Sequence, residues 1–185
     1  MMKLTFAIFA LFLIASCSNS NKADFEVKAE LQMMDTLKTR LDEVKSWLDK
    51  MPLSEIKERK DIVNHNLDFI ESYHKESGEK VDIETAQLFD EYKGYGKLYG
   101  RTIDAYKHIV METEELYVQL KTLKESAHSK DYKKELFLNY FQKEKADVEQ
   151  LYNYSKSYLY RIIETDLMFE RSQKRIEEVA EKLKK

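Results

Sequence analysis

Cysteine, proline and glycine are scarce in this chain of 185 residues, which contains one Cys, one Pro and four Gly. A single cysteine cannot form a disulfide within the chain, so the fold has to be stabilised by packing. Proline and glycine are the residues that most often interrupt helices and form turns, and their scarcity predicts few turns. Because 35% of the residues are charged, the sequence indicates long amphipathic helices.

An excess of charge of one sign is also missing. The chain has 31 Lys and Arg against 34 Asp and Glu, a formal net charge of −3, and both signs are mixed along its length. Binding to nucleic acid or to an anionic membrane surface by charge alone requires a basic patch or run. We therefore expect no nucleic-acid partner.

Motifs for catalysis are lacking as well: there is no nucleophile with its base, no phosphate-binding glycine loop and no cysteine-based metal site. The spacing Glu-x-x-His occurs twice, at Glu71 and His74 and at Glu125 and His128, and it is the spacing used by di-iron helical bundles. Both pairs fall in the last turns of predicted helices, at opposite ends of the third helix. We therefore expect no metal site, no cofactor and no enzymatic activity.

Only one long hydrophobic run is present, and it begins the chain. Lys3 precedes the segment 4–14, which is apolar apart from Thr5, and the small residues Ala15 and Ser16 follow it. A positive charge, a short apolar run and small residues, in this order, are typical of an export signal. The run is too short to be a membrane-spanning helix.

The end of this segment, Ile14-Ala15-Ser16-Cys17, resembles the lipobox of bacterial lipoproteins, and Cys17 is the only cysteine. The resemblance implies that residues 1–16 are removed and that Cys17 becomes a lipidated N-terminus carrying acyl chains, enough to hold the chain at a membrane. Ser18 follows where Asp would imply retention at the inner membrane, so the resemblance implies the outer membrane of the cell envelope. The alternative is an ordinary secretory signal and a released, soluble protein.

Residues 17–22 are expected to form a short tether. In the residues that follow the tether, apolar side chains recur with the period of a helix. In the first stretch, from Ala23 to Lys50, they recur in steps of three and four and form one stripe. Pro52 interrupts the stripe, and Ser54 is expected to cap a second stretch that ends at Gly78. The apolar residues of these two stretches are Val27, Leu31, Met34, Leu37, Leu41, Val44, Leu48, Met51, Ile56, Val63, Leu67, Ile70 and Tyr73.

Two longer helices are predicted to follow, one capped by Asp82 and running to about Ala127, the other capped by Ser129 or Asp131 and running to the C-terminus. The expected stripe of the third helix is Phe89, Tyr92, Gly96, Tyr99, Ile103, Tyr106, Val110, Thr113, Tyr117 and Leu120. That of the last helix is Phe137, Phe141, Val148, Leu151, Tyr158, Ile162, Thr165, Phe169, Ile176, Val179 and Leu183.

These stripes stay in register if the chain folds back at its turns, as in an antiparallel coiled-coil hairpin. Reversal at Ser129 places Phe89 opposite Phe169, and reversal near residue 80 places Val63 near Gly96. The fold class is therefore all-α, an elongated antiparallel bundle of three long rods whose first rod is kinked or broken at Pro52, giving three or four helices. Because the tract 136–141 is apolar over a wide arc, we favour three rods, with the start of the domain at the Ser129 turn. Residues 23–185 would form this single domain.

Tyrosines and glycines concentrate at one place in the third helix. Glycine inside a helix costs about 1 kcal/mol relative to alanine, so three of them require a reason. One interpretation is close packing, in which a missing side chain makes room for a tyrosine ring from the opposite helix. The other is a groove that binds a small ligand between helices. The candidate residues are Tyr92, Tyr95, Gly96, Tyr99, Gly100, Tyr154 and Tyr158, with Gly94 beside them.

From the sequence we expect a protein anchored in the bacterial envelope through lipid on Cys17. Its function would be that of a structural or interaction module, a helical rod whose partner is another envelope protein. The alternative is a small-ligand-binding lipoprotein that uses the tyrosine and glycine groove. A groove filled by the protein's own side chains would favour the rod, and an open cavity would favour ligand binding.

Overall fold

A computed structural model describes residues 27–129 and 133–184, all of them helical apart from short connections. The predicted signal segment, Cys17 and the tether lie outside the described residues. The elements are α1 (Lys28–Lys50), α2 (Leu53–Ser77), α3 (Ile83–Ser129), α4 (Lys134–Ser155), the π-helical η1 (Lys156–Tyr160) and α5 (Arg161–Leu183). The described part of the chain contains no strand, and the predicted all-α class is confirmed.

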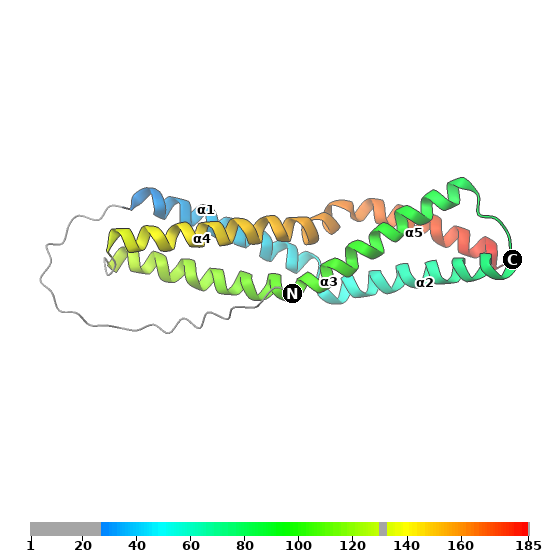
Figure 1. Cartoon of the computed structure of the whole chain (residues 1–185), viewed down its shortest axis with the longest axis horizontal. Coiled ribbons are helices and arrows are strands. Elements are labelled where there is room, and N and C mark those ends of the chain that lie inside the picture. The colour runs from blue at the N-terminus through cyan, green and yellow to red at the C-terminus, as the bar shows by residue number, and fades with distance from the viewer. Residues whose placement is uncertain (1–26, 130–132, 185) are drawn as a thin grey trace, which may run out of the picture.

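The chain passes along the molecule three times (Figure 1). α1 and α2 follow one another as the first rod, α3 returns over the whole length with 47 residues, and α4, η1 and α5 form the third rod without interruption. α1 packs against α3 and α4, whereas α2 packs against α3 and α5. This is the three-rod arrangement that the sequence favours, with the start of α1 and the α3–α4 turn at one end of the bundle (Figure 1).

The break in the first rod lies where proline predicts it. α1 ends at Lys50, Met51 follows as its C-cap, and Pro52 takes an extended conformation with ψ of 151°. The Tyr106 hydroxyl of α3 donates to the Leu48 carbonyl at 3.4 Å and accepts a hydrogen bond from the Leu53 backbone N–H. One side chain thus satisfies backbone groups of both helix ends, which would otherwise lack intrahelical partners.

Some of the predicted helix ends are confirmed and others need correction. Gly78 follows α2 in the left-handed conformation with φ of 68°, and the Asp82 carboxylate accepts from the Thr85 N–H at 2.9 Å, as predicted. Ser54 does not cap α2, because the helix already begins at Leu53. Likewise α3 extends through Ser129, and the residue before α4 is Lys133 with no side-chain cap.

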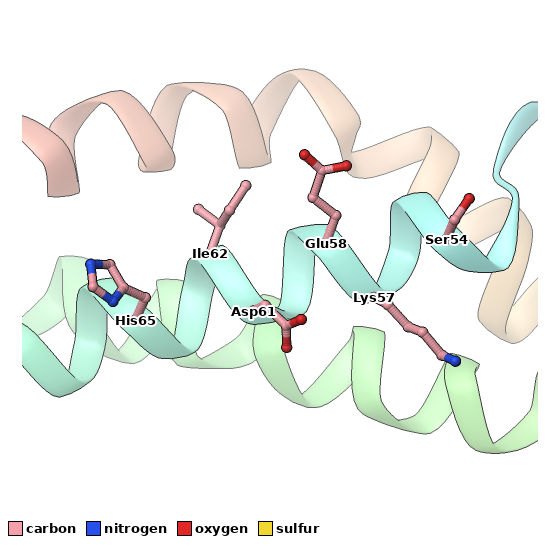
Figure 2. Close-up of a pocket in the computed structure, with 6 residues that line it drawn as sticks. All are labelled: Ser54, Lys57, Glu58, Asp61, Ile62 and His65. Atoms are coloured by element: carbon pink, nitrogen blue, oxygen red, sulfur yellow. The ribbon is translucent and has the colours of Figure 1, made fainter.

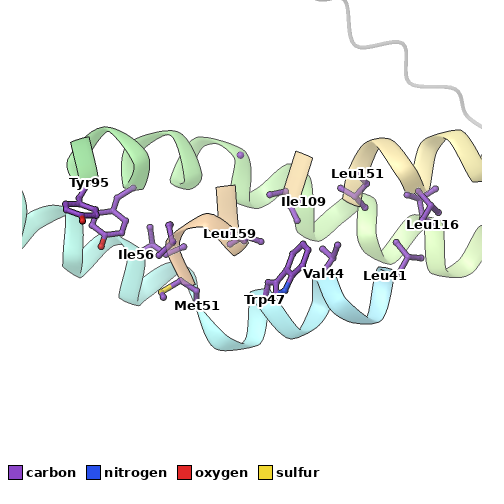
Figure 3. Close-up of a cluster of buried hydrophobic side chains, with 14 of the residues drawn as sticks. Leu41, Val44, Trp47, Met51, Ile56, Tyr95, Ile109, Leu116, Leu151 and Leu159 are labelled. Atoms are coloured by element: carbon purple, nitrogen blue, oxygen red, sulfur yellow. The ribbon is translucent and has the colours of Figure 1, made fainter. Parts of the chain in front are cut away.

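The core runs along the axis of the bundle and joins all three rods (Figure 3). Trp47 lies where the first rod breaks, and its ring centroid is 5.3 Å from those of both Tyr152 and Tyr160. Tyr160 belongs to η1, so the π-helical turn and the proline break occur at the same level of the bundle. Here the first rod changes from packing beside α4 to packing beside α5.

The buried stripe of α3 differs from the predicted one by one position in its middle part. The residues expected there are only half-buried: Ile103, Tyr106, Val110 and Tyr117. The buried residues are their neighbours Thr102, Ala105, Ile109 and Leu116. The physical reason is that α3 contacts two rods, so its most buried line lies between the two contact stripes.

Two exchanges of the same kind occur in the third rod. Leu159 is buried in place of Tyr158, and Ala180 in place of Val179. Leu159 lies within η1, whose wider turn alters which residue faces the core.

Candidate functional site

Three tyrosines on successive turns of α3 surround one phenylalanine of α5. The ring centroids of Tyr92, Tyr95 and Tyr99 lie 6.1, 5.4 and 5.4 Å from that of Phe169. All four side chains are buried. The sequence predicts Phe89 as the partner of Phe169, whereas the observed partners lie closer to the middle of α3. The chain reverses beyond Ser129, and this shifts the register between the two rods.

The hydroxyl groups of this tyrosine cluster are paired with polar side chains. The Tyr92 hydroxyl donates to Gln173 and accepts from Asn66 Nδ2 at 3.3 Å. The Glu91 carboxylate accepts from the Ser172 hydroxyl at 2.6 Å and from Tyr95 at 3.4 Å. Burial raises the pKa of Tyr92 to about 12, so its phenol stays protonated and can act as a donor at neutral pH.

Arg59 of α2 closes the cluster on its outer side. The guanidinium lies 5.4 Å from the Phe169 ring centroid, forms ion pairs with Glu55 at 2.8 Å and with Asp166, and donates to the Tyr99 hydroxyl. Burial raises the pKa of Tyr99, and the hydrogen bond from Arg59 partly opposes this effect. All strong polar groups here have partners, so the arrangement is that of a satisfied core network.

The three glycines of this region have different surroundings. A Cβ atom at Gly96 would lie 3.0 Å from Val63 Cγ1, so the predicted contact between Val63 and Gly96 is confirmed. At Gly100 the nearest atom to such a Cβ is Lys60 Nζ, 3.7 Å away, and at Gly94 there is none within 4 Å. Close packing therefore explains Gly96 alone, and the neighbour that needs the room is a valine of α2 instead of the tyrosine expected.

The other two candidate tyrosines lie elsewhere. Tyr154 contacts Tyr158 at 4.8 Å and His108 at 5.7 Å between ring centroids, and both tyrosines are half-buried. His108 is more than two helical turns from Tyr99 along α3. The structure thus divides the seven predicted residues into the tyrosine cluster, with its adjacent glycines, and a separate pair near His108.

Sequence reasoning did not find the polar members of the cluster. Arg59 stands in a run of charged residues and carries no signal that separates it from its neighbours. Asn66, Ser172 and Gln173 are equally inconspicuous, since each becomes part of the network only through packing of three helices. Pairing of buried hydroxyl groups was the available clue, because a buried tyrosine requires a polar partner.

The two Glu-x-x-His pairs lie at the C-terminal ends of two different helices. His74 is in the last turn of α2, where its Nδ1 lies 3.2 Å from the Glu79 carbonyl oxygen, and His128 is in the last turn of α3. These turns are at opposite ends of the bundle (Figure 1). Within residues 27–129 and 133–184, no group of three or more His, Asp or Glu side chains is arranged to hold a metal ion.

One side of α2 carries a shallow hollow of about 570 Å³. Figure 2 shows that its lining side chains all belong to α2, among them Lys57, Glu58, Asp61 and His65. Ile62, 38% exposed, is the one large apolar side chain in this lining. A surface provided by a single helix can contact a partner, but it does not converge on a small molecule from several sides as ligand sites do.

Among the described residues, two buried side-chain polar atoms have no hydrogen-bond partner, Glu144 Oε2 and Ser155 Oγ. Glu144 is 7% exposed and lies on α4 between the apolar residues Phe141 and Val148 of the core. Burial raises the pKa of this carboxyl, and the negative charges of Asp147 and Glu115 add to the effect, whereas Lys143 opposes it. The structure identifies these two groups; the sequence analysis did not.

Comparison with known proteins adds no relative: no family model, no curated protein and no solved structure matches the chain. No described helix has the length and apolar composition needed to cross a bilayer. The described residues thus belong to the class of three-rod helical bundles, and their tyrosine cluster is filled by the protein's own side chains.

Proposed function

We propose that this protein is a lipid-anchored rod of the bacterial envelope that presents its long helical faces to another envelope protein and has no catalytic activity. The observation that carries the proposal is the position of the first residues of α1. α1 begins at the end of the bundle that holds the α3–α4 turn, so a tether from Cys17 would attach one tip of an elongated molecule (Figure 1). The outer membrane is the expected site of anchorage.

The filled tyrosine cluster supports the rod over the alternative ligand groove. Phe169 occupies the space between Tyr92, Tyr95 and Tyr99, and Val63 occupies the space beside Gly96. Large apolar side chains that remain exposed on the long faces, such as Val118, Leu167 and Met168, are available for contact with a partner. Binding of a ligand by the seven candidate residues stays a prediction.

Anchorage is tested by comparing the full chain with its Cys17→Ser variant in cells. We expect the full chain to fractionate with membranes and to gain the mass of acyl chains, and the variant to lose both properties. A matched Ser18→Ala variant should retain both. Membrane fractionation and an acyl-free mass for the unaltered chain would contradict the proposal.

Partner contact is tested with a photoreactive amino acid at exposed positions of the anchored protein. We expect Leu167 or Met168 to give a discrete crosslinked product in intact cells, and the charged residue Glu178, exposed on the same helix, to give none. The product formed from position 168 should disappear when Leu167 is changed to Asp. Equal crosslinking at all three positions would indicate nonspecific proximity and contradict a defined interaction face.

A further inference from the structure

An apolar hollow lies between α1 and α3, outside the tyrosine cluster. It measures about 390 Å³, within the range of small-molecule sites of roughly 300–1,000 Å³. Met34 and Leu120, both buried, form part of its lining, together with Tyr117 and Val118. Val118 is 65% exposed, so an apolar occupant would cover a side chain that water now contacts.

One side of this hollow is held in place by polar contacts. The Tyr117 hydroxyl donates to Asp42 of α1, and Lys38 Nζ lies 5.7 Å from the centroid of the Tyr117 ring. Lys38 in turn contacts Asp42 at 2.8 Å. The ring is therefore fixed between the two helices before any ligand arrives, which lowers the entropic cost of binding.

The same lining carries positive charge. It includes the ammonium groups of Lys38, Lys121 and Lys124 and a single carboxylate, that of Asp35. Lys124 is paired with Asp35 at 2.6 Å, whereas Lys121 is the least engaged, 77% exposed and 3.9 Å from Glu125. Exposed ion pairs of this kind contribute little stability, so an anionic group can compete for these lysines.

Two other hollows of the described residues lack this combination. The hollow over η1 is lined by the polar or charged residues Asn153, Lys156, Ser157, Arg161, Glu164 and Thr165 of one continuous rod. It lacks the apolar floor, and the hollow on α2 in Figure 2 lacks a second helix. Apolar surface from two helices together with a surplus of lysines selects for a molecule with an apolar chain and an anionic head.

We propose that the hollow between α1 and α3 binds a single-chain amphiphile with an anionic head group, of the long-chain carboxylate class. The alkyl chain lies against Met34, Val118 and Leu120, and the carboxylate interacts with Lys121 and Lys124. This inference does not depend on lipidation at Cys17 or on the proposed envelope partner. It can therefore fail or succeed independently of the proposed function.

The test uses the chain from Ser18 to Lys185, which contains every described helix and has no cysteine to acylate. Dodecanoate and dodecyltrimethylammonium are titrated calorimetrically below their micelle concentrations, and dodecanol below its solubility limit in water. We expect saturable 1:1 binding of dodecanoate, roughly tenfold weaker binding of the alcohol and still weaker binding of the cation, since tenfold corresponds to one well-placed charge interaction. No saturable binding of dodecanoate, or equal binding of all three, would overturn the proposal.

Two variants test whether the ligand binds in this hollow. Val118→Trp should fill it and weaken dodecanoate binding at least about tenfold, since displaced apolar contact and lost volume act together. The matched control is Leu167→Trp, because Leu167 is 68% exposed on α5 and lies far from this site; binding should not change. Lys121→Glu should weaken binding by a smaller factor that shrinks at high salt. Equal binding by the Val118 and Leu167 variants would overturn the assignment.

The remaining occupant to consider is a second copy of the chain. Light scattering on the same samples measures the molecular mass with and without dodecanoate, and we expect a monomer in both. A dimer that Val118→Trp dissociates and dodecanoate does not affect would show that the hollow is covered by a second copy, and it would overturn the amphiphile proposal.

Discussion

The two halves of this bundle are stabilised in different ways. In the half formed by α1, α4 and the second part of α3, the core is mainly aliphatic, with Leu37, Leu41 and Val148 among its members. In the half formed by α2, α5 and the first part of α3, three tyrosines and Phe169 are buried together with aliphatic side chains such as Ile70 and Ile176. The boundary between the halves lies at Pro52 and η1.

The polar groups of the two halves differ as well. In the α2/α5 half the tyrosine hydroxyls and Arg59 all have partners, so the half carries more polar atoms in its core without leaving them unpaired. In the α1/α4 half the Glu144 carboxylate is buried with one oxygen unpaired. A core rich in polar atoms is therefore not destabilised by their number; what matters is whether each buried polar atom has a partner.

The largest effect is expected from removal of the Phe169 ring, which three tyrosines surround in the α2/α5 half. Phe169→Ala should lower the free energy of unfolding by about 3–5 kcal/mol, because it leaves a cavity among three tyrosines and removes the contact with Arg59. Urea denaturation followed by circular dichroism measures the change. Leu167→Ala on the same helix should stay within about 0.5 kcal/mol, and a similarly small loss for Phe169→Ala would contradict the packed cluster.

Two glycines of α3 separate packing from helix propensity. Gly96→Leu should lower the free energy of unfolding by about 1–3 kcal/mol, because its side chain would clash with Val63. Gly94→Leu should raise it by up to about 1 kcal/mol, because that position is open and leucine favours the helix more than glycine does. Thermal melts of the two variants should therefore shift in opposite directions. Shifts of the same sign would refute the difference in their surroundings.

The stability of the α1/α4 half is expected to depend on pH through the Glu144 carboxylate, which has one unpaired oxygen. Because the pKa of Glu144 is raised above its ordinary value of 4.5, the folded protein keeps this proton at pH values where the unfolded chain has lost it. Its contribution to stability should decline as pH rises from 4.5 through the raised pKa and then stay low.

The Glu144→Gln variant tests this pH dependence. At pH 8 it should be about 1–2 kcal/mol more stable than the unaltered chain, and near pH 4 the difference should vanish. The measurement is a series of urea titrations between pH 4 and pH 8. Glu149→Gln serves as the control, since Glu149 is paired with Arg40 at 3.4 Å and 42% exposed, and its pH profile should follow that of the unaltered chain. If the Glu144→Gln variant kept the pH profile of the unaltered chain, the carboxylate would have to be hydrated.

The smallest effect is expected at a paired hydroxyl of the α2/α5 half. Tyr92→Phe keeps the ring beside Phe169 but removes the hydrogen bonds with Asn66 and Gln173, so we expect a loss of about 1 kcal/mol in the free energy of unfolding. Denaturant titration of the variant measures it. If the loss matched that of Phe169→Ala, the polar network rather than the ring packing would dominate this half.

Several parts of the fold could be predicted because their causes are local. Pro52 ends a helix through its own ring, Gly78 ends another through its positive φ, and Asp82 caps the next through a carboxylate three residues from Thr85. The candidate site was predicted only in part. Tyr92, Tyr95 and Tyr99 do gather at one place, but the neighbour of Gly96 and the separate location of Tyr154 depend on the register between rods.

Residue spacing alone was enough to predict an all-α fold of long helices, the interruption at Pro52 and the helix end at Gly78, and it left open whether the first two helices form one rod. These properties depend on residue spacing of a few positions and on the conformational limits of proline and glycine. The packing of the rods was needed to see which line of α3 is most buried, that Arg59 joins the tyrosine cluster, and that one carboxylate oxygen of Glu144 lacks a partner. Each of these depends on side chains from two or three rods meeting at one level, and spacing along a single helix does not specify that meeting.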